Sequence, residues 1–313
     1  MRREDKIYVA GHSGLVGSAI VRRLQEQGYE NLVLRTHREL DLTRQPDVEA
    51  FFKEEKPDYV IDAAAMVGGI KANAAAPADF LYVNMQIQDN LIISAFWQGV
   101  RKFLFLGSAC MYPKECPQPM KEEMLLTGLP EYTNEGYALA KICGSRLCSY
   151  LYRQHGAPFI SAIPANTYGL NDCFDPQRSH VIPALIAKYH NAKVNKLPSV
   201  ELWGTGTPLR EFIYADDIGD GCIFLLNNYE GEEPVNMGTG EEISMLDLSR
   251  LIGKVVGYEG EIVTDPSKPD GMMRRILSSE RIRKMGWQPS VSLEEGLTRL
   301  YRWYLEHVQK EAI

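Results

Sequence analysis

Tyr137 and Lys141 place a phenol and an ammonium group four residues apart, in the run Tyr-Ala-Leu-Ala-Lys. On a helix, this spacing brings both side chains onto one face. A nearby cation stabilises a phenolate, so we expect Lys141 to lower the pKa of Tyr137. Such a tyrosine can give a proton to a carbonyl oxygen while hydride arrives at the carbon. Ser108 ends a predicted strand and can hydrogen-bond the same oxygen, so the three residues predict carbonyl reduction.

A glycine-rich segment at residues 11–17 has the pattern G-x-x-G-x-x-G, between a predicted strand and a predicted helix. Glycines allow a tight turn there, and the N–H groups of the helix N-terminus suit a pyrophosphate. The segment therefore predicts a dinucleotide site, although a turn without a ligand is the alternative. The residues expected to contact the cofactor are Gly11, His12, Ser13, Gly14, Leu15, Val16 and Gly17.

The second predicted strand ends at a basic cluster formed by Arg35, His37 and Arg38. An acidic residue at this position would bind the 2′-hydroxyl of NAD. Cations instead suit the 2′-phosphate of NADP, so the cluster favours NADP(H). The alternative is that these are solvated surface charges.

Alternating strands and helices must position these groups. Such alternation predicts an α/β fold, a Rossmann-like doubly wound parallel sheet with right-handed crossovers. Ligands of such sheets bind at the carboxyl ends of the strands. The expected strands are 7–10, 32–35, 59–65, 103–108 and 159–166, and the expected helices are 18–27, 46–55, 77–98 and 135–155.

The pattern loosens after residue 166. We expect an NADP-binding domain at 1–166, to which segments near 205–240 return, and a smaller α/β substrate-binding lobe at 167–313. The segment 210–226 should begin extended and become helical at its two aspartates, because carboxylates suit a helix N-terminus. The other expected elements are a strand at 200–204 and helices at 181–191, 245–256, 278–285 and 293–306.

The composition excludes several classes of protein. The formal net charge of −7 disfavours a nucleic-acid binder, which usually carries a basic stripe. The six cysteines lack zinc-site spacing, so we expect free thiols and no metal. The sequence shows no signal-peptide pattern and no long apolar run, so we expect a cytoplasmic protein without a membrane segment.

The order of the glycine loop, the serine and the Tyr/Lys pair resembles that of the extended short-chain dehydrogenase/reductases. Several further segments resemble the GDP-L-fucose synthase family within that group, and the resemblance covers essentially the whole chain. These segments are AAAMVGGIKAN (63–73), PADF (77–80), YPKECPQPMKEEMLLTG (112–128), SHVIPAL (179–185), WGTGTPLREF (203–212) and SKPDG (267–271).

The resemblance implies epimerisation at C3 and C5 of GDP-4-keto-6-deoxy-D-mannose, followed by NADPH-dependent reduction at C4. It identifies Cys110 as the base and His180 as the acid of the epimerisation. A thiol and an imidazole both have ordinary pKa values within reach of neutrality. Ser108 and Tyr137 would hold the enolate oxygen meanwhile. The family also implies a homodimer, paired through the helices at 77–98 and 135–155.

The resemblance also assigns binding residues. For the cofactor they are Asp41, Leu42, Leu106, Gly107, Ser108, Ala109, Pro164, Ala165, Asn166 and Thr167, together with Tyr137, Lys141 and His180. For the GDP-sugar they are Lys188, Trp203, Arg210 and Asp270.

The chain departs from the family pattern at a few positions. Ser13 and His37 stand where basic residues commonly help to hold the 2′-phosphate, and Ala109 replaces a serine. Two alternatives follow. One is a nucleotide-sugar 4-ketoreductase that lacks epimerisation or acts on another 6-deoxy-4-keto sugar or a heptose. The other is a non-catalytic NADP-binding regulator, which an intact Ser108, Tyr137 and Lys141 disfavour.

Overall fold

The computed structural model describes residues 1–175, 179–268 and 270–308. Its centre is a six-stranded sheet in which every neighbouring pair of strands is parallel. This confirms the expected Rossmann-like α/β fold. In spatial order the strands are β10 (Val235–Met237), β5 (Phe159–Pro164), β4 (Lys102–Leu106), β3 (Tyr59–Asp62), β1 (Ile7–Ala10) and β2 (Leu32–Val33).

Side chains of each central strand alternate between two hydrophobic layers. Ile7 and Val9 of β1 pack in one layer, and Tyr8 and Ala10 pack in the other. Two buried faces require helices on both sides of the sheet. Helices α1 (Leu15–Glu26) and α7 (Ala215–Asn228) cover the first face, and α2 (Gln45–Glu55), α4 (Pro77–Trp97) and α5 (Glu135–His155) cover the second.

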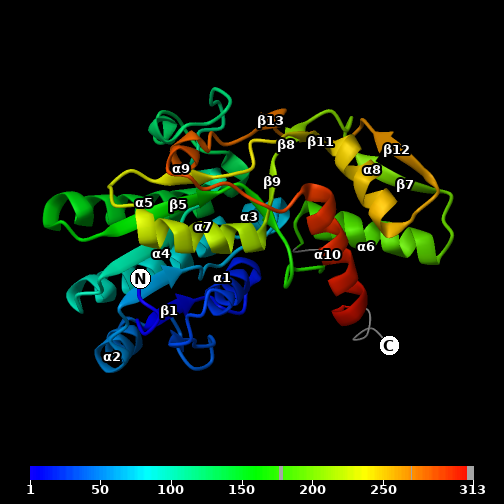
Figure 1. Ribbon diagram of the computed structural model, residues 1–313. Coiled ribbons are helices and arrows are strands. Elements are labelled where there is room, and N and C mark those ends of the chain that lie inside the picture. The colour runs from blue at the N-terminus through cyan, green and yellow to red at the C-terminus, as the bar shows by residue number, and fades with distance from the viewer. Residues whose placement is uncertain (176–178, 269, 309–313) are drawn as a thin grey trace.

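A second group of elements lies on the side of the molecule away from the N-terminus (Figure 1). It has its own hydrophobic core, centred on buried side chains such as Tyr189, Leu248 and Leu300. Its members are α6 (Val181–Val194), α8 (Met245–Val256), α10 (Leu293–His307) and the parallel pair β7 (Ser199–Trp203) and β12 (Glu261–Asp265).

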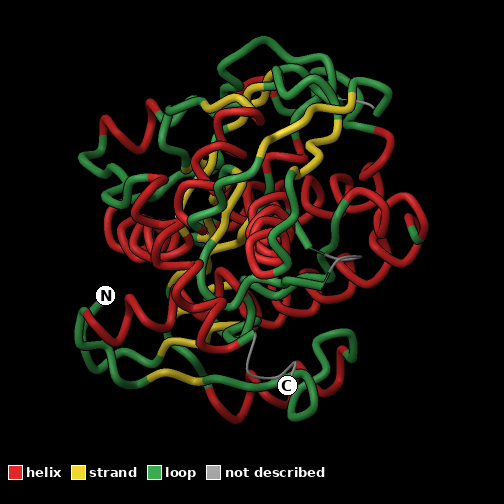
Figure 2. Tube along the Cα trace, turned by 90° about the vertical axis from the view of Figure 1, so that its right-hand side faces the viewer, coloured by secondary structure: helices red, strands yellow, loops and turns green. Residues whose placement is uncertain are grey.

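Short elements connect the two groups, and long loops gather at the upper end of the view in Figure 2. Three strands form a small sheet, β11 (Ile243–Ser244), β8 (Leu209–Arg210) and β13 (Arg274–Arg275), and β6 (Asn166–Tyr168) pairs with β9 (Phe212–Tyr214). The remaining elements are α3 (Ile70–Ala75), α9 (Glu280–Lys284) and the 3₁₀ turns η1 (Ala109–Met111), η2 (Glu122–Met124) and η3 (Tyr132–Asn134).

The sequence predicted several boundaries well, including those of α5 and α8. The segment 210–226 changes from extended to helical at Ala215, next to the two aspartates. The single strand expected at 159–166 was wrong, because it divides into β5 and β6. At the division, the Ala165 N–H donates to Met237 O of β10, and β6 then leaves the central sheet to pair with β9. No helix in the described part of the chain is long and apolar enough to cross a membrane.

Candidate active site

The predicted Tyr/Lys pair lies in the first two turns of α5, which packs against the central sheet. Lys141 is buried, and its Nζ donates a hydrogen bond to Leu106 O at 2.9 Å. The same ammonium group lies 4.6 Å from the centroid of the Phe105 ring. These contacts fix the cation beneath the carboxyl end of β4, where ligands of parallel sheets bind.

Ser108 follows β4 directly and lies beside the tyrosine. Its hydroxyl accepts a hydrogen bond from Cys110 N at 3.3 Å and is also hydrogen-bonded to the Tyr137 phenol. Residues 109–111 form the turn η1, so Cys110 follows Ser108 through a turn and not along an extended strand. The turn nevertheless keeps Cys110 near the phenol, close enough for its charge to affect the tyrosine.

The expected lowering of the Tyr137 pKa is not found. Burial raises the pKa well above its usual value, the Cys110 thiol adds to this increase, and the Ser108 hydrogen bond opposes it. The main cause is desolvation of the phenol, and the ammonium of Lys141 donates its hydrogen bond to the Leu106 carbonyl. Burial also lowers the pKa of Lys141, and the negative charge of Asp62 opposes this decrease. A phenol that stays protonated remains a hydrogen-bond donor and a source of a proton.

The thiol of Cys110 has a partner that the sequence reasoning missed. Asn134 is the residue before the first turn of α5, and its Nδ2 donates a hydrogen bond to Cys110 Sγ at 3.0 Å. The two residues are 24 positions apart in the chain, so no local pattern indicated the contact. The turn after β4 and the start of α5 together place the thiol.

Asp62, the last residue of β3, is a second group that the sequence reasoning missed. It is fully buried, and its Oδ1 accepts a hydrogen bond from Ala64 N at 3.0 Å. Burial raises the pKa of this carboxyl to about 6, against the field of the Lys141 ammonium. In the sequence, only its position as an aspartate in an apolar predicted strand set this residue apart. When ionised, Asp62 supplies a negative field to the buried Lys141.

The glycine loop has the geometry that a dinucleotide requires. Gly11 has a φ of 73°, and a Cβ there would lie 2.7 Å from the Ala63 backbone. A Cβ on Gly17 would lie 2.0 Å from Gly11 O, so the helix must begin this close to the strand. Exposed Gly14 caps α1 and leaves the N–H groups of its first turn open to a phosphate. Leu15 and Val16 begin the helix, and His12 and Ser13 form the turn before it.

The three residues of the basic cluster differ in how exposed and how paired they are. Arg35 is paired with Glu55 of α2 and also donates to Leu34 O. His37 is 81% exposed and lies 3.9 Å from Asp41. Arg38 is exposed, and it forms no ion pair with any residue that the structure describes. Of the three cations, Arg38 is therefore the one whose charge is most available to a 2′-phosphate.

Other residues assigned to the cofactor lie along the same edge of the sheet. Leu106, Gly107 and Ala109 are buried at the end of β4. Asn166 is exposed and donates to Glu211 O at 2.8 Å. Leu42 O accepts a hydrogen bond from Asn90, which fixes the loop after β2. Pro164, Ala165 and Thr167 surround the junction of β5 and β6.

His180 stands at the N-terminus of α6, and its side chain is 51% exposed. Within the described residues, no hydrogen bond or ion pair joins it to Ser108, Cys110 or Tyr137. Its Nδ1 lies instead 4.0 Å from Oδ1 of buried Asp172. Desolvation lowers the pKa of His180. His180 thus belongs to the second group of elements, at the start of α6.

The four predicted substrate residues surround β7 and β8. Lys188 donates to Glu201 O, and Trp203 is 56% exposed with its indole N–H 2.9 Å from Glu201 Oε1. Asp270 accepts hydrogen bonds from the N–H and the hydroxyl of Thr205 at 2.7 and 2.9 Å. This carboxylate therefore fixes the loop after Trp203. The ammonium groups of Lys71 and Lys268 lie over the indole ring, 5.3 and 6.0 Å from its centroid.

Arg210 has a cationic neighbour that the sequence reasoning missed. Arg275 of β13 is in register with Arg210 of β8, and neither forms an ion pair with a described residue. Burial lowers the pKa of Arg210, and Arg275 lowers it further. Arg275 also donates from Nη2 to Ala109 O at 2.6 Å, next to Cys110. Two partly buried guanidinium groups without a carboxylate form a site suited to a diphosphate.

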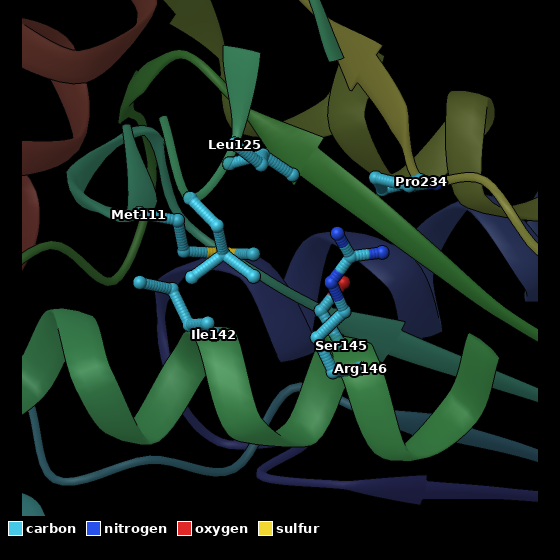
Figure 3. A pocket seen from close by; sticks show the side chains of 7 residues that line it. Met111, Leu125, Ile142, Ser145, Arg146 and Pro234 are labelled. Atoms are coloured by element: carbon cyan, nitrogen blue, oxygen red, sulfur yellow. The ribbon is translucent and has the colours of Figure 1, made fainter. Parts of the chain in front are cut away.

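A small cavity lies behind the turn η1, on α5 (Figure 3). Met111 and Ile142 point into it, with Leu125 opposite and Ser145 and Arg146 further along the helix. Its lining includes none of the predicted catalytic residues, so it is part of the packing that supports the turn. The described residues contain no group of His, Cys, Asp and Glu side chains arranged to hold a metal ion.

Comparisons with known proteins agree with this arrangement. Residues 7–238 match the NAD dependent epimerase/dehydratase family. The chain is 57% identical to GDP-L-fucose synthase 1 of Arabidopsis thaliana, over 98% of this chain and 95% of that protein. A GDP-6-OMe-4-keto-L-xylo-heptose reductase from Campylobacter jejuni superimposes with a TM-score of 0.92 at 37% identity, covering 98% of this chain and 99% of the other. A GDP-L-fucose synthetase from Naegleria fowleri bound to NADP has a TM-score of 0.91 at 27% identity, covering 99% and 96%.

Proposed function

The chain belongs to the NAD dependent epimerase/dehydratase family and, within it, to the GDP-L-fucose synthases, and we propose that it makes GDP-L-fucose. Its substrate is GDP-4-keto-6-deoxy-D-mannose. The sugar is inverted at C3 and C5 and then reduced at C4, with NADP(H) as the cofactor. The observation that carries this proposal is the grouping of Ser108, Cys110 and Tyr137 around one point.

The C4 ketone determines both stages of the reaction. It acidifies the hydrogens at C3 and C5, because the carbanion is delocalised onto the ketone oxygen. Ser108 and Tyr137 are hydrogen-bond donors for that oxygen while it carries negative charge. Cys110, two residues after Ser108, is positioned to take a proton from the adjacent carbon. His180, on the opposite group of elements, returns a proton to the other face.

Reduction uses the same oxygen site. When bound, NADPH supplies hydride to C4. Tyr137 gives its proton to the oxygen, and burial, which raises its pKa, keeps that proton in place beforehand. Lys141 holds its charge below the phenol and near the cofactor edge of β4. Arg210 and Arg275 bind the diphosphate, and half-exposed Trp203 contacts the GDP-sugar.

The test is incubation with GDP-4-keto-6-deoxy-D-mannose and NADPH in D₂O. We expect deuterium at C3 and C5, consumption of NADPH, and GDP-L-fucose as the product. Cys110→Ser should lose deuterium incorporation and retain reduction of an already epimerised ketone. Unchanged incorporation in Cys110→Ala would overturn the assignment of the base.

A 4-ketoreductase without epimerisation is the second candidate, because the C. jejuni heptose reductase has a TM-score of 0.92. Reduction alone requires neither Cys110 nor His180, and both residues are present. Consumption of NADPH without exchange at either carbon in D₂O would favour this candidate.

We further propose a homodimer formed through α4 and α5. Their outer faces expose large apolar side chains, among them Tyr82 and Trp97 on α4 and Leu139 and Tyr150 on α5. Pairing of these helices with those of a second copy would bury these side chains. Gel filtration at the mass of a 35.3 kDa monomer would contradict the dimer. We also propose a cytoplasmic location. We further propose a division into a cofactor domain at 1–166, to which segments near 205–240 return, and a substrate lobe formed mainly by 167–313.

A further inference from the structure

Asp172 is a buried carboxyl group for which the proposed reaction has no stated use. It is 8% exposed, and its Oδ2 has no hydrogen-bond partner among the residues that the structure describes. Its Oδ1 accepts a hydrogen bond from Cys173 N at 2.8 Å and lies 4.0 Å from His180 Nδ1. Burying a carboxyl group with one oxygen that lacks a hydrogen bond costs folding free energy. Such a group calls for an explanation, and a functional role is one.

The position of Asp172 relative to the imidazole is specific. Asp172 lies on the Nδ1 side of His180, whose side chain is otherwise 51% exposed. Asp172 is the one charged group within ion-pair distance of His180 among the described residues. A carboxylate on the Nδ1 side attracts a proton on that nitrogen and so favours the ring orientation that leaves Nε2 for the substrate.

We propose that Asp172 is a positioning residue for His180, orienting the imidazole and stabilising its protonated form during epimerisation. This inference rests on the proposed function, because it assumes that His180 is an acid. In the step itself, the Nε2–H bond breaks and the proton forms a C–H bond with the substrate carbanion. The imidazolium becomes neutral imidazole, which keeps its Nδ1–H directed at the carboxylate. The negative charge of the carbanion is thereby neutralised.

The electrostatics of the pair agree with this role. Burial raises the pKa of Asp172 to about 7, and the hydrogen bond from Cys173 N opposes this rise. Desolvation lowers the pKa of His180. When His180 is protonated, the carboxylate of Asp172, 4.0 Å from Nδ1, stabilises the imidazolium.

The decisive variant is Asp172→Asn, because an amide of the same shape still accepts from Cys173 N but carries no charge. We expect deuterium incorporation in D₂O to fall about 10- to 100-fold, a part of the 10²–10⁴-fold that general acid–base catalysis contributes. Reduction of an already epimerised ketone and the KM for NADPH should remain unchanged. Loss of the anion also destabilises the imidazolium, so the alkaline limb of the exchange profile should move to lower pH.

Two further variants serve as controls. Asp175→Asn makes the same chemical change at an exposed residue of the same loop, and it should leave exchange unchanged. Asp172→Glu keeps the charge and should recover part of the exchange rate. Wild-type exchange in Asp172→Asn, or a lower rate with an unmoved pH profile, would overturn the inference. Failure of the wild-type protein itself to exchange deuterium would instead contradict the proposed function.

Discussion

Asn134 Nδ2 lies 3.0 Å from Cys110 Sγ, so the cap residue of α5 donates a hydrogen bond to the thiol in the turn after β4. This contact joins the element that carries Tyr137 to the element that carries the proposed base. A donor at this distance orients the sulfur and stabilises negative charge on it.

Asn134→Ala removes this donor from Cys110. We expect deuterium exchange to slow about 10-fold or more, because a hydrogen bond to a charged group contributes about 1.5–3 kcal/mol. Reduction of an epimerised ketone should change little. The measurement is exchange by NMR, with Thr133→Ala in the same turn as the control. Equal exchange in wild-type and Asn134→Ala protein would show that the contact has no catalytic role.

Tyr137→Phe removes the proton donor from the oxygen site. We expect reduction to fall about 10²–10⁴-fold, the range of general acid catalysis. The ring should keep its position, because its contact with Phe80, at a centroid distance of 6.5 Å, does not involve the hydroxyl. Single-turnover oxidation of NADPH measures the step. A fall of less than threefold would exclude Tyr137 as the donor.

Arg275→Met should weaken binding of the GDP-sugar. Loss of one guanidinium from the Arg210/Arg275 pair removes a charge-assisted contact with the diphosphate, and we expect Kd for GDP to rise about 10- to 100-fold. Calorimetry with GDP tests this without turnover. Arg274→Met is the matched control, because Arg274 is exposed and paired with Glu242. Equal affinities in the two variants would place the diphosphate elsewhere.

Arg38→Ala tests the preference for NADP(H). Arg35 is already paired with Glu55, so we expect Arg38 to supply charge to the 2′-phosphate. The KM for NADPH should rise about 10-fold, equivalent to about 1.4 kcal/mol, while the KM for NADH stays unchanged. Parallel rises in both KM values would point to a general loss of structure at the cofactor site.

Asp62 should make stability depend on pH. Burial raises its pKa from an ordinary value near 3.8 to about 6 in the folded protein. The folded state thus holds this proton more tightly than the unfolded state, and the resulting stabilisation is present at low pH and lost as pH rises through 6. Between pH 5 and 8 the free energy of unfolding of the wild-type protein should fall by roughly 1 kcal/mol relative to that of Asp62→Asn, because about one unit of the pKa shift lies above pH 5. Denaturant unfolding at both pH values measures this difference, and parallel changes in the two proteins would exclude it.

The fold was predictable because its determinants are local. The short apolar runs at 7–10 and 103–108 predicted strands buried in the sheet, and helical spacing predicted α5 and α8. The division at Ala165 was not predictable, because its N–H bonds to Met237, far along the chain. Pairing of distant segments has no local pattern.

Part of the site was predictable, because some of its residues occur in local sequence motifs. Ser108, Tyr137 and Lys141 occur in motifs whose spacing reflects helix and strand geometry. Asn134, Asp172 and Arg275 occur in no such motif, and their contacts with Cys110, His180 and Ala109 bring together different elements. The direction of the Tyr137 pKa shift was also beyond the sequence, because it depends on burial and on where Lys141 points.

The sequence by itself determined the kind of chemistry, since residue types and helical or strand spacing place a phenol, an ammonium and a glycine loop on neighbouring parts of a parallel sheet. The tertiary structure alone decided the electrostatic state of these groups. Desolvation and charge fields depend on every element packed around an atom, whatever its distance in the chain. For that reason the proton on Tyr137, the field of Asp62 on Lys141 and the carboxyl behind His180 emerge only when the chain is folded.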